Sequence, residues 1–439
     1  MVWLIAGAVW FTLYFRFVNV RGFVHALRLV SGRETGSREP GEVSHFRALA
    51  TAVSGTVGVG NIAAVAILVS VAGPGATVWL IVAGFLGMST KFVECTLGVK
   101  YRQHNPDGSI AGGPMFYIHQ GFAELGKPRL GRGLAVYYAV CLMIGCLGIG
   151  CMFQSNQAYV QFRDVTGGAA SFFADRAWLF GLLLALLVGA VIVGGIRSIA
   201  RVSGTLVPFM AALYLLGALI VLGANIERIP EAIGIMLRSA VTPEGVAGGF
   251  FGVMIQGFRR AVFSNEAGIG SSSVAHSAVR TKEPATEGYV AMLEPFIDTV
   301  VICTLTALVI TVTVWTPEMT GVASGVELTS AAFASVVSWF PLPLAVVVML
   351  FAFSTMISWA YYGQAAFVYL FGAAPGGKLL FNLVFCGFVL LGCTTQMTAI
   401  IDFSDSLVFA MALANVLALF VLGPVVRREV TGYWERRAG

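Results

Sequence analysis

The sequence predicts an all-α integral membrane protein with about eleven transmembrane helices. Of its 439 residues, 57% are hydrophobic and only 11% are Asp, Glu, Lys or Arg, whereas a soluble domain carries about 25% charged residues. The mean hydropathy is +0.84, and a soluble chain of this length would need more surface charge to stay dispersed. The connections between the apolar runs are short, so we expect one transmembrane domain over 1–439.

A helix needs about 20 apolar residues to cross the hydrocarbon core of a bilayer. Eleven runs approach or exceed this length: 2–18, 47–71, 74–99, 133–162, 178–196, 203–223, 246–278, 288–315, 341–371, 378–400 and 403–426. Two further stretches, 113–123 and 325–338, are predicted as surface or re-entrant helices.

The distribution of basic residues predicts the orientation, because cytoplasmic loops collect Lys and Arg. One alternating set of loops and span ends holds 20 of the 27 basic residues, the opposite set holds four, and three lie within spans. With eleven spans, this places the amino terminus outside and the carboxyl terminus in the cytoplasm. We therefore expect a multi-pass protein of the plasma or inner membrane.

Several functional classes are disfavoured by the same sequence. The net charge of +5 is no nucleic-acid signature, because the basic residues lie beside apolar spans instead of forming a patch. The seven cysteines lie in apolar stretches without disulfide or zinc spacing. The five histidines lie at span ends or in loops and form no catalytic triad. We therefore expect neither an enzyme nor a nucleic-acid partner, and the lipid bilayer is the predicted surrounding.

Two spans carry the same glycine pattern. Residues 54–61 and 264–271 both read Ser-x-x-x-Gly-x-Gly followed by a small polar residue. Each glycine inside a helix costs about 1 kcal/mol relative to Ala, so the repetition needs a reason. Close packing of helices through small residues is one interpretation. The other is a pair of discontinuous helices at corresponding places in two halves, which is the best sequence pointer to a transporter site.

The position of these two segments favours the second interpretation. They begin the first and sixth spans of a ten-span block, and the five spans from one to the other invert the second half. This predicts a leucine-transporter-type fold with an extra N-terminal helix 2–18, a first inverted repeat 47–223 and a second 246–426. The breaks are expected at 54–61 and at about 257–271. Half-helix N–H groups would bind an anion and unwound carbonyls a cation, and a channel stays the alternative.

Charged residues inside the spans are costly and usually paired or functional. Lys91 and Glu94 are three residues apart near a cytoplasmic helix end, so a structural ion pair is favoured over a gate. Arg259 and Arg260 precede the second break, where one is expected to meet Glu266, to cap an unwound turn or to bind a substrate carboxylate.

Two acidic residues, Glu294 and Asp298, share one face of the eighth span. Relay of protons, binding of a cation and structural hydrogen bonding all stay open for this pair. Gln154 lies in a polar cluster of the fourth span, where we expect it to face the pocket. Ser354 and Thr355 either bond to their own backbone or, beside carbonyls of a broken helix, suit a hard cation that prefers oxygen ligands.

The chain resembles the alanine or glycine:cation symporter family of the amino acid–polyamine–organocation group. The resemblance covers nearly the whole sequence and rests on long motifs. The matching runs are 55–63, 73–76, 87–94, 99–102, 112–115, 152–156, 263–271, 294–299 and 353–363.

The resemblance implies secondary active import of small neutral amino acids, alanine or glycine, coupled to sodium, with proton coupling as the alternative. The substrate residues that it implies are Gly58, Gly60 and Asn61 for the carboxylate, Gln154 for the amino group, and Phe263, Thr355 and Trp359 for the side chain. The sodium ligands that it implies are Gly55, Gly58, Ser354 and Thr355.

Overall fold

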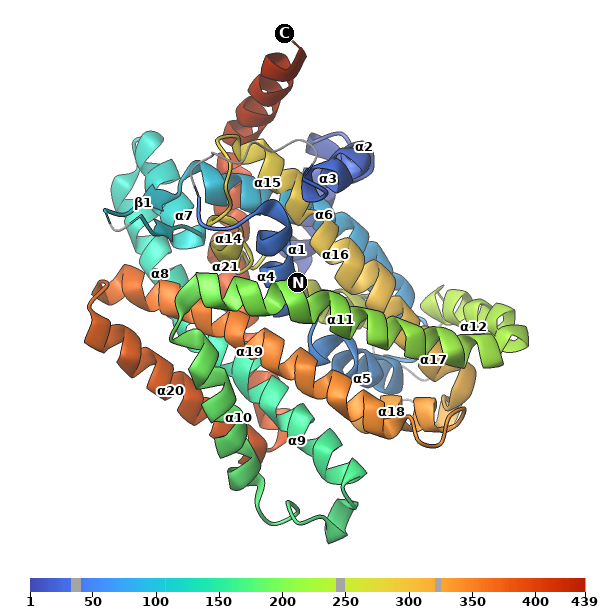
Figure 1. Cartoon of the computed structure of the whole chain (residues 1–439). Coiled ribbons are helices and arrows are strands. Elements are labelled where there is room, and N and C mark those ends of the chain that lie inside the picture. Colours follow the sequence, from blue (N-terminus) through green and yellow to red (C-terminus); the bar gives the residue numbers. More distant parts are fainter. Residues whose placement is uncertain (33–40, 107, 242–248, 320–324, 439) are drawn as a thin grey trace.

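The computed structural model describes residues 1–32, 41–106, 108–241, 249–319 and 325–438. Most of these residues are helical (Figure 1). The chain begins with α1 (Val2–Tyr14), α2 (Val18–Arg21) and α3 (Phe23–Val30).

The first half of the ten-span block follows. Its elements are α4 (His45–Thr56), η1 (Val59–Asn61), α5 (Ala63–Ala72), α6 (Ala76–Lys100), β1 (Gln103–His104), β2 (Ile110–Ala111), α7 (Pro114–Glu124), α8 (Pro128–Leu147), η2 (Gly148–Met152), α9 (Phe153–Val165), η3 (Gly168–Ala170), α10 (Ala177–Ile192) and α11 (Gly195–Ala224). The strands β1 and β2 form a small antiparallel hairpin. The connection to the second half contains η4 (Ile226–Arg228) and α12 (Ile229–Val241).

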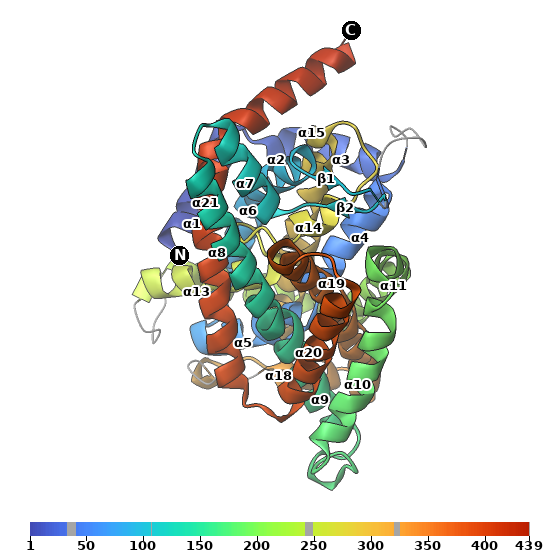
Figure 2. The same ribbon diagram turned by 90° about the vertical axis from the view of Figure 1, so that its left-hand side faces the viewer.

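The second half has the same general plan. Its elements are α13 (Gly249–Asn265), α14 (Ser273–His276), α15 (Pro284–Ala291), α16 (Leu293–Pro295), η5 (Phe296–Cys303), α17 (Thr304–Thr313), η6 (Pro317–Met319), α18 (Val326–Ala334), α19 (Pro341–Phe371), α20 (Pro375–Thr394) and α21 (Met397–Ala438). The last turns of α21 extend past the rest of the molecule (Figure 1 and Figure 2).

Helices at corresponding places in the two halves pack against each other. Counted within the ten-span block, which leaves out the N-terminal helix, the second span, α6, contacts α15 of the seventh. The third span of the block begins with α8, which packs on α19 of the eighth, and the fourth, α10, packs on α20 of the ninth. Two inverted repeats of five spans are expected to pack in this way. The boundaries of the repeats, 47–223 and 246–426, stay a prediction.

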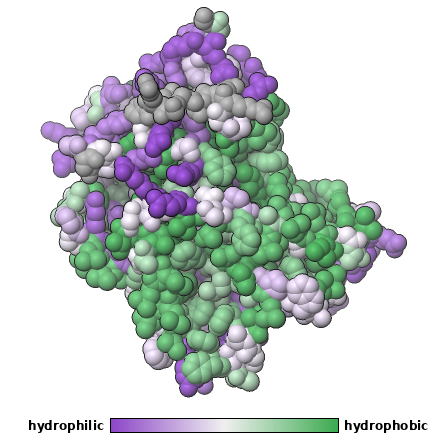
Figure 3. Space-filling view, in the orientation of Figure 1, coloured by the Kyte–Doolittle hydropathy of each residue, from purple (hydrophilic) through white to green (hydrophobic). Residues whose placement is uncertain are grey.

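The outer surface fits a lipid environment. On α10, Phe180, Leu184 and Val188 recur every four residues and are buried, whereas Leu186 and Leu187 are 63% and 59% exposed. An apolar helix that also exposes large aliphatic side chains is expected where lipid replaces water. Figure 3 shows a broad hydrophobic face, with hydrophilic residues gathered at the end that carries the C-terminus. The chain is therefore a multi-pass membrane protein.

Within the described residues, seven helices are long and apolar enough to cross a membrane, and the bent pair 45–56 and 59–72 makes an eighth. The other three predicted spans correspond to the shorter apolar helices α1 and α10 and to α13 with α14 across the second break. The count of eleven therefore stays an expectation. The predicted surface helices 113–123 and 325–338 correspond to α7 and α18.

Two segments of π-helix lie beside the breaks. η2 ends two residues before Gln154, and η5 contains Asp298. A π-helical turn inserts a residue into the helix and often occurs at functional sites. Both segments thus change the direction of side chains that approach the centre of the molecule.

Candidate functional site

The first break interrupts the helix for only a few residues. α4 continues to Thr56, Gly58 is extended, and α5 leaves at an angle of 55° to α4. The Oδ1 atom of Asn61 accepts a hydrogen bond from Gly58 N–H (2.9 Å), and Gln154 Oε1 accepts one from Val59 N–H (3.1 Å). Side chains thus accept hydrogen bonds from the backbone N–H groups that the break leaves unpaired. Inside a membrane such groups need a partner within the protein, because water is absent there.

The second break begins later than predicted. α13 is helical through Asn265, so the interruption covers 266–272 and not 257–271. Glu266, Gly268 and Gly270 have φ values of 58°, 96° and 84°. These left-handed conformations, which glycine adopts readily and other residues rarely, end the helix, whereas no residue of 257–265 adopts one.

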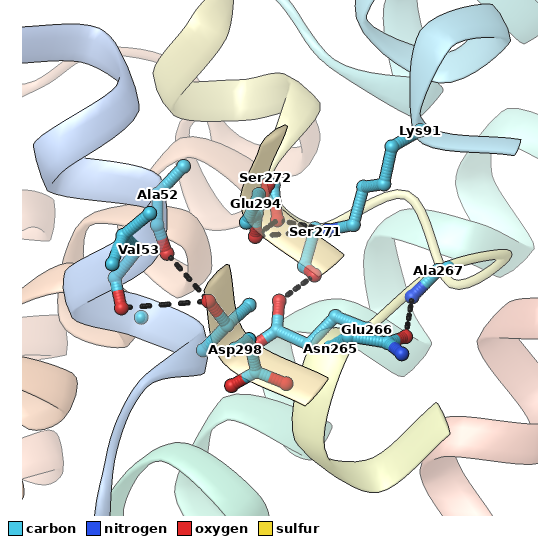
Figure 4. Close-up of polar contacts among 12 residues, drawn as sticks. Ala52, Val53, Lys91, Asn265, Glu266, Ala267, Ser271, Ser272, Glu294 and Asp298 are labelled. Carbon is cyan, nitrogen blue, oxygen red and sulfur yellow. Dashed lines mark hydrogen bonds and ion pairs between the residues drawn. The ribbon is translucent and has the colours of Figure 1, made fainter. Parts of the chain in front are cut away.

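Side chains from other helices hold the second break in place. Glu94 Oε1 accepts hydrogen bonds from Gly268 N–H (2.9 Å) and from Asn415 Nδ2 (2.7 Å). Tyr138 donates to the carbonyl of Ile269 at 2.7 Å. Within the segment, Asn265 Oδ1 accepts from Ala267 N–H, and Ser271 donates to Glu266 (Figure 4).

One buried cluster joins the two breaks. Asn61 Nδ2 donates to Asp298 Oδ1 at 2.6 Å and to Ser264 Oγ at 3.2 Å. Asp298 Oδ2 accepts from Ser264 (2.7 Å) and from Thr299 (2.6 Å). Asp298 therefore has structural hydrogen bonds to both broken helices, and all four side chains are buried.

The predicted substrate residues lie together. A methyl group on Gly58 would overlap the Thr355 hydroxyl and lie 3.0 Å from Gln154 Oε1, and one on Gly60 would lie 4.0 Å from Phe263. The seventh predicted residue, Trp359, packs so closely on Gly150 that a Cβ there would overlap the indole. All seven predicted substrate residues, of which Asn61 is one, are buried.

Trp359 also binds both breaks directly. Its Nε1 donates to the carbonyl of Gly55 (3.3 Å) and to Glu266 Oε1 (3.0 Å). The indole is therefore fixed between α4 and the unwound segment of the second half. The bond to Glu266 was not predicted, because the sequence does not show that residues 93 positions apart meet.

The predicted sodium residues form a second group. Thr355 Oγ1 donates to the carbonyl of Ser54 (3.0 Å), and Ser54 Oγ donates to the carbonyl of Ser354 (2.7 Å). Ser354 Oγ bonds back to Phe351 O at 3.0 Å. Hydroxyl and carbonyl oxygens of α4 and α19 thus face one another beside Gly55.

A chain of buried charges runs from the second break toward the start of α4. Lys91 Nζ lies 3.1 Å from Glu294 Oε1 and also contacts Ser272 (Figure 4). Further along, Glu287 accepts from His276 at 2.5 Å and from His45. The predicted pair of Lys91 with Glu94 is wrong, because Glu94 binds Gly268 N–H of the second break and Asn415 of α21, and Lys91 pairs with Glu294.

The two arginines before the second break serve the packing of α13. Arg259 Nη2 lies 2.5 Å from Asp405 Oδ2 on α21. Arg260 lies 4.0 Å from the same carboxylate oxygen, with its guanidinium 5.6 Å from the centre of the Phe263 ring. The expected contact of one of them with Glu266 is therefore not formed.

The site is covered toward both ends of the molecule. At one end, residues 41–43 pair with 278–280 through a parallel bridge of Val43 and Val279, and Arg102 donates to the Val279 carbonyl. At the other end α18 lies over α5, where Thr329 donates to the Ile62 carbonyl at 3.2 Å. A solute between the breaks would be enclosed on both sides.

Comparisons with known proteins agree on one family. The model of the Sodium:alanine symporter family matches residues 1–439. The sodium/alanine symporter AgcS of Methanococcus maripaludis is 36% identical over 440 residues, which cover 100% of this chain and 94% of AgcS. The amino-acid carrier protein AlsT of Bacillus subtilis is 30% identical over 436 residues, with 99% and 89% covered.

A solved structure has the same fold. The crystal structure of MhsT in complex with L-phenylalanine matches with a TM-score of 0.62 at 16% identity, over 88% of this chain and 89% of MhsT. This likeness confirms the leucine-transporter-type fold that the paired glycine segments predict.

Proposed function

The chain belongs to the sodium:alanine symporter family and is a sodium-coupled amino-acid symporter, not an enzyme; from this premise we propose that it imports small neutral amino acids, alanine or glycine. The observation that carries the proposal is the crowding between the two breaks. Phe263 lies over Gly60, and its ring packs edge-on against Phe153 with 5.1 Å from centre to centre. Trp359 is held by two hydrogen bonds. In this proposal a methyl side chain fits beside these rings, whereas a branched one would displace them.

The backbone of the first break provides the groups for the substrate's carboxylate. Gly60 brings its N–H group to the amino-terminal end of α5, where the helix dipole favours an anion. Gly58 N–H donates to Asn61 Oδ1 and would exchange this partner for the carboxylate when the substrate binds. Asn61 acts as a positioning residue in this scheme, since its amide is engaged by Gly58 and Asp298. Gln154 and the carbonyls near residues 261–263 take the amino group.

Sodium binds beside the substrate in this proposal. The carbonyls of Gly55 and Gly58 with the hydroxyls of Ser354 and Thr355 give the oxygen ligands that a hard cation prefers. The ligand set bridges α4 and α19, so occupation by sodium favours the arrangement in which these helices are close. A substrate that needs the same arrangement then binds more tightly, which is the coupling between the two solutes.

Transport proceeds by alternating access, with the covers at the two ends opening in turn. Opening at the end predicted to face the cytoplasm requires residues 41–43 to separate from 278–280. Opening at the other end requires α18 to leave α5. The buried pair of Lys91 and Glu294 stays with the second break throughout, because separating two buried charges is costly.

Uptake of labelled amino acids into proteoliposomes tests the proposal. An inward sodium gradient should drive accumulation of alanine or glycine, whereas leucine, glutamine and phenylalanine should accumulate much less. Thr355→Ala should raise the sodium concentration for half-maximal uptake, because an enclosed site loses one oxygen ligand. Ser335→Ala, a hydroxyl deletion on the loop after α18, serves as the matched control. Uptake that ignores sodium and follows an imposed pH gradient would replace sodium coupling with proton coupling.

A further inference from the structure

A basic pocket lies where the end of α1 meets α21. It encloses about 360 Å³ and is lined by three arginines, Arg16, Arg21 and Arg427. None of the three guanidiniums has an acidic partner within the described part of the chain. Arg427 lies over the ring of Tyr14, 5.4 Å from its centre. Three exposed cations around one hollow repel each other, so the pocket favours an anion.

An exposed apolar stripe adjoins this pocket. Phe17, Val20, Val24 and Leu27 lie three or four residues apart on α2 and α3 and the turn before them, and they are 48%, 56%, 59% and 49% exposed. The opposite face of α3 is buried against the protein. An apolar face beside arginines is typical of a helix that lies in the membrane interface, with its apolar side toward the acyl chains.

The position of both features fits the surface of the bilayer. α1 is apolar, and Arg16 is the first charged residue after it. Figure 1 places α2 and α3 at the end of the molecule from which the C-terminal part of α21 emerges. Arg16 and Phe17 have φ values of 53° and 57°, a left-handed turn that is unusual for residues with side chains. This turn joins the apolar helix to the stripe and carries one of the three arginines.

We propose that this pocket binds the phosphate headgroup of an anionic phospholipid. The guanidiniums of Arg16, Arg21 and Arg427 give paired donors that match phosphate oxygens, and the lipid's acyl chains lie along the stripe. Basic pockets between membrane helices are suited to such headgroups. The stripe favours a lipid over free phosphate, because a soluble anion would leave four large apolar side chains in water.

Native mass spectrometry of the full chain in detergent, titrated with phosphatidylglycerol or phosphatidylcholine, tests this proposal. The wild-type protein should bind the first phosphatidylglycerol more tightly than phosphatidylcholine. Each arginine near a charged surface contributes about fivefold to affinity, so replacing all three by Gln should weaken this first binding by about a hundredfold. The matched control replaces Lys127, Arg129 and Arg132 by Gln, which removes the same charge outside the pocket.

The outcomes separate lipid binding from its alternatives. Equal binding of both lipids, or an equal loss in the control variant, would overturn the proposal. A wild-type first site filled by inorganic phosphate as tightly as by phosphatidylglycerol would also overturn it, because the stripe would then contribute nothing. Lys replacements of the three arginines should restore only part of the binding, because an ammonium keeps the charge but lacks the paired donors of a guanidinium. Monodispersity on gel filtration verifies that each variant is folded. The proposal is independent of the transported solute.

Discussion

Two glycines of the first break should respond very differently to the same added methyl group. In Gly58→Ala the methyl overlaps the Thr355 hydroxyl and meets Gln154 Oε1 at 3.0 Å. These side chains are buried and hydrogen-bonded, so they cannot simply turn away. Overpacking of this kind typically costs about 1–3 kcal/mol, or about 5- to 150-fold in an equilibrium constant.

In Gly60→Ala the nearest atom to the new methyl is Phe263 Cδ1 at 4.0 Å, an ordinary contact. We therefore expect Gly60→Ala to lower the free energy of unfolding clearly less than Gly58→Ala does, because the new methyl displaces no neighbouring atom. The methyl would, however, point toward Phe263, which the proposal assigns to the wall of the substrate's side-chain pocket. Gly60→Ala should thus lower uptake of alanine more than uptake of glycine.

The assay compares both variants with the wild type by thermal unfolding of the purified proteins, followed through tryptophan fluorescence, and by uptake of glycine and alanine. Gly58→Ala should unfold at a lower temperature and require more sodium for uptake, since Thr355 is displaced. Gly60→Ala should unfold near the wild-type temperature with a lower alanine-to-glycine ratio. Equal thermal destabilisation in both variants would refute the packing argument, and an unchanged ratio in Gly60→Ala would refute the position of the substrate.

Three further predictions concern the pocket wall, the buried charges and the orientation. Trp359→Leu should widen the pocket and admit valine or leucine while weakening alanine uptake; an unchanged substrate profile would place the indole outside the pocket. Lys91→Met should destabilise the protein by about 3–5 kcal/mol, because it leaves Glu294 buried without its cation, and the double variant Lys91→Met/Glu294→Met should recover part of this loss. A cysteine at Glu231 should react with an impermeant thiol reagent from outside the cell and one at Lys127 should not; the reverse pattern would invert the orientation.

The paired glycine segments are an example of a feature that the sequence predicts. The spacing of Gly58 with Gly60 and of Gly268 with Gly270 marks both breaks, because local backbone conformation depends on local residues. The glycine pattern does not give the start of the second break, since positive φ begins only at Glu266 and not near residue 257. Apolar length likewise predicts most spans, but the amphipathic α2 and α3 are too short to stand out by hydropathy.

Partners across the molecule could not be predicted in the same way. Lys91 has an acidic neighbour at 94, yet it pairs with Glu294, which is 203 residues away in the chain. Which acidic residue pairs with Lys91 depends on where α16 and the second break lie relative to α6. No local sequence pattern encodes the distance between these elements. The bond from Trp359 to Glu266 arises in the same way.

Thermodynamic coupling between sodium and the amino acid is the central property of the proposed transporter. The measurement that tests it is the alanine gradient at which net flux across proteoliposomes stops, recorded as the sodium gradient is varied. Coupled transport predicts that this zero-flux alanine gradient rises in step with the imposed sodium gradient. A zero-flux point that stays at equal alanine concentrations on both sides, whatever the sodium gradient, would contradict the account and indicate an uncoupled pathway.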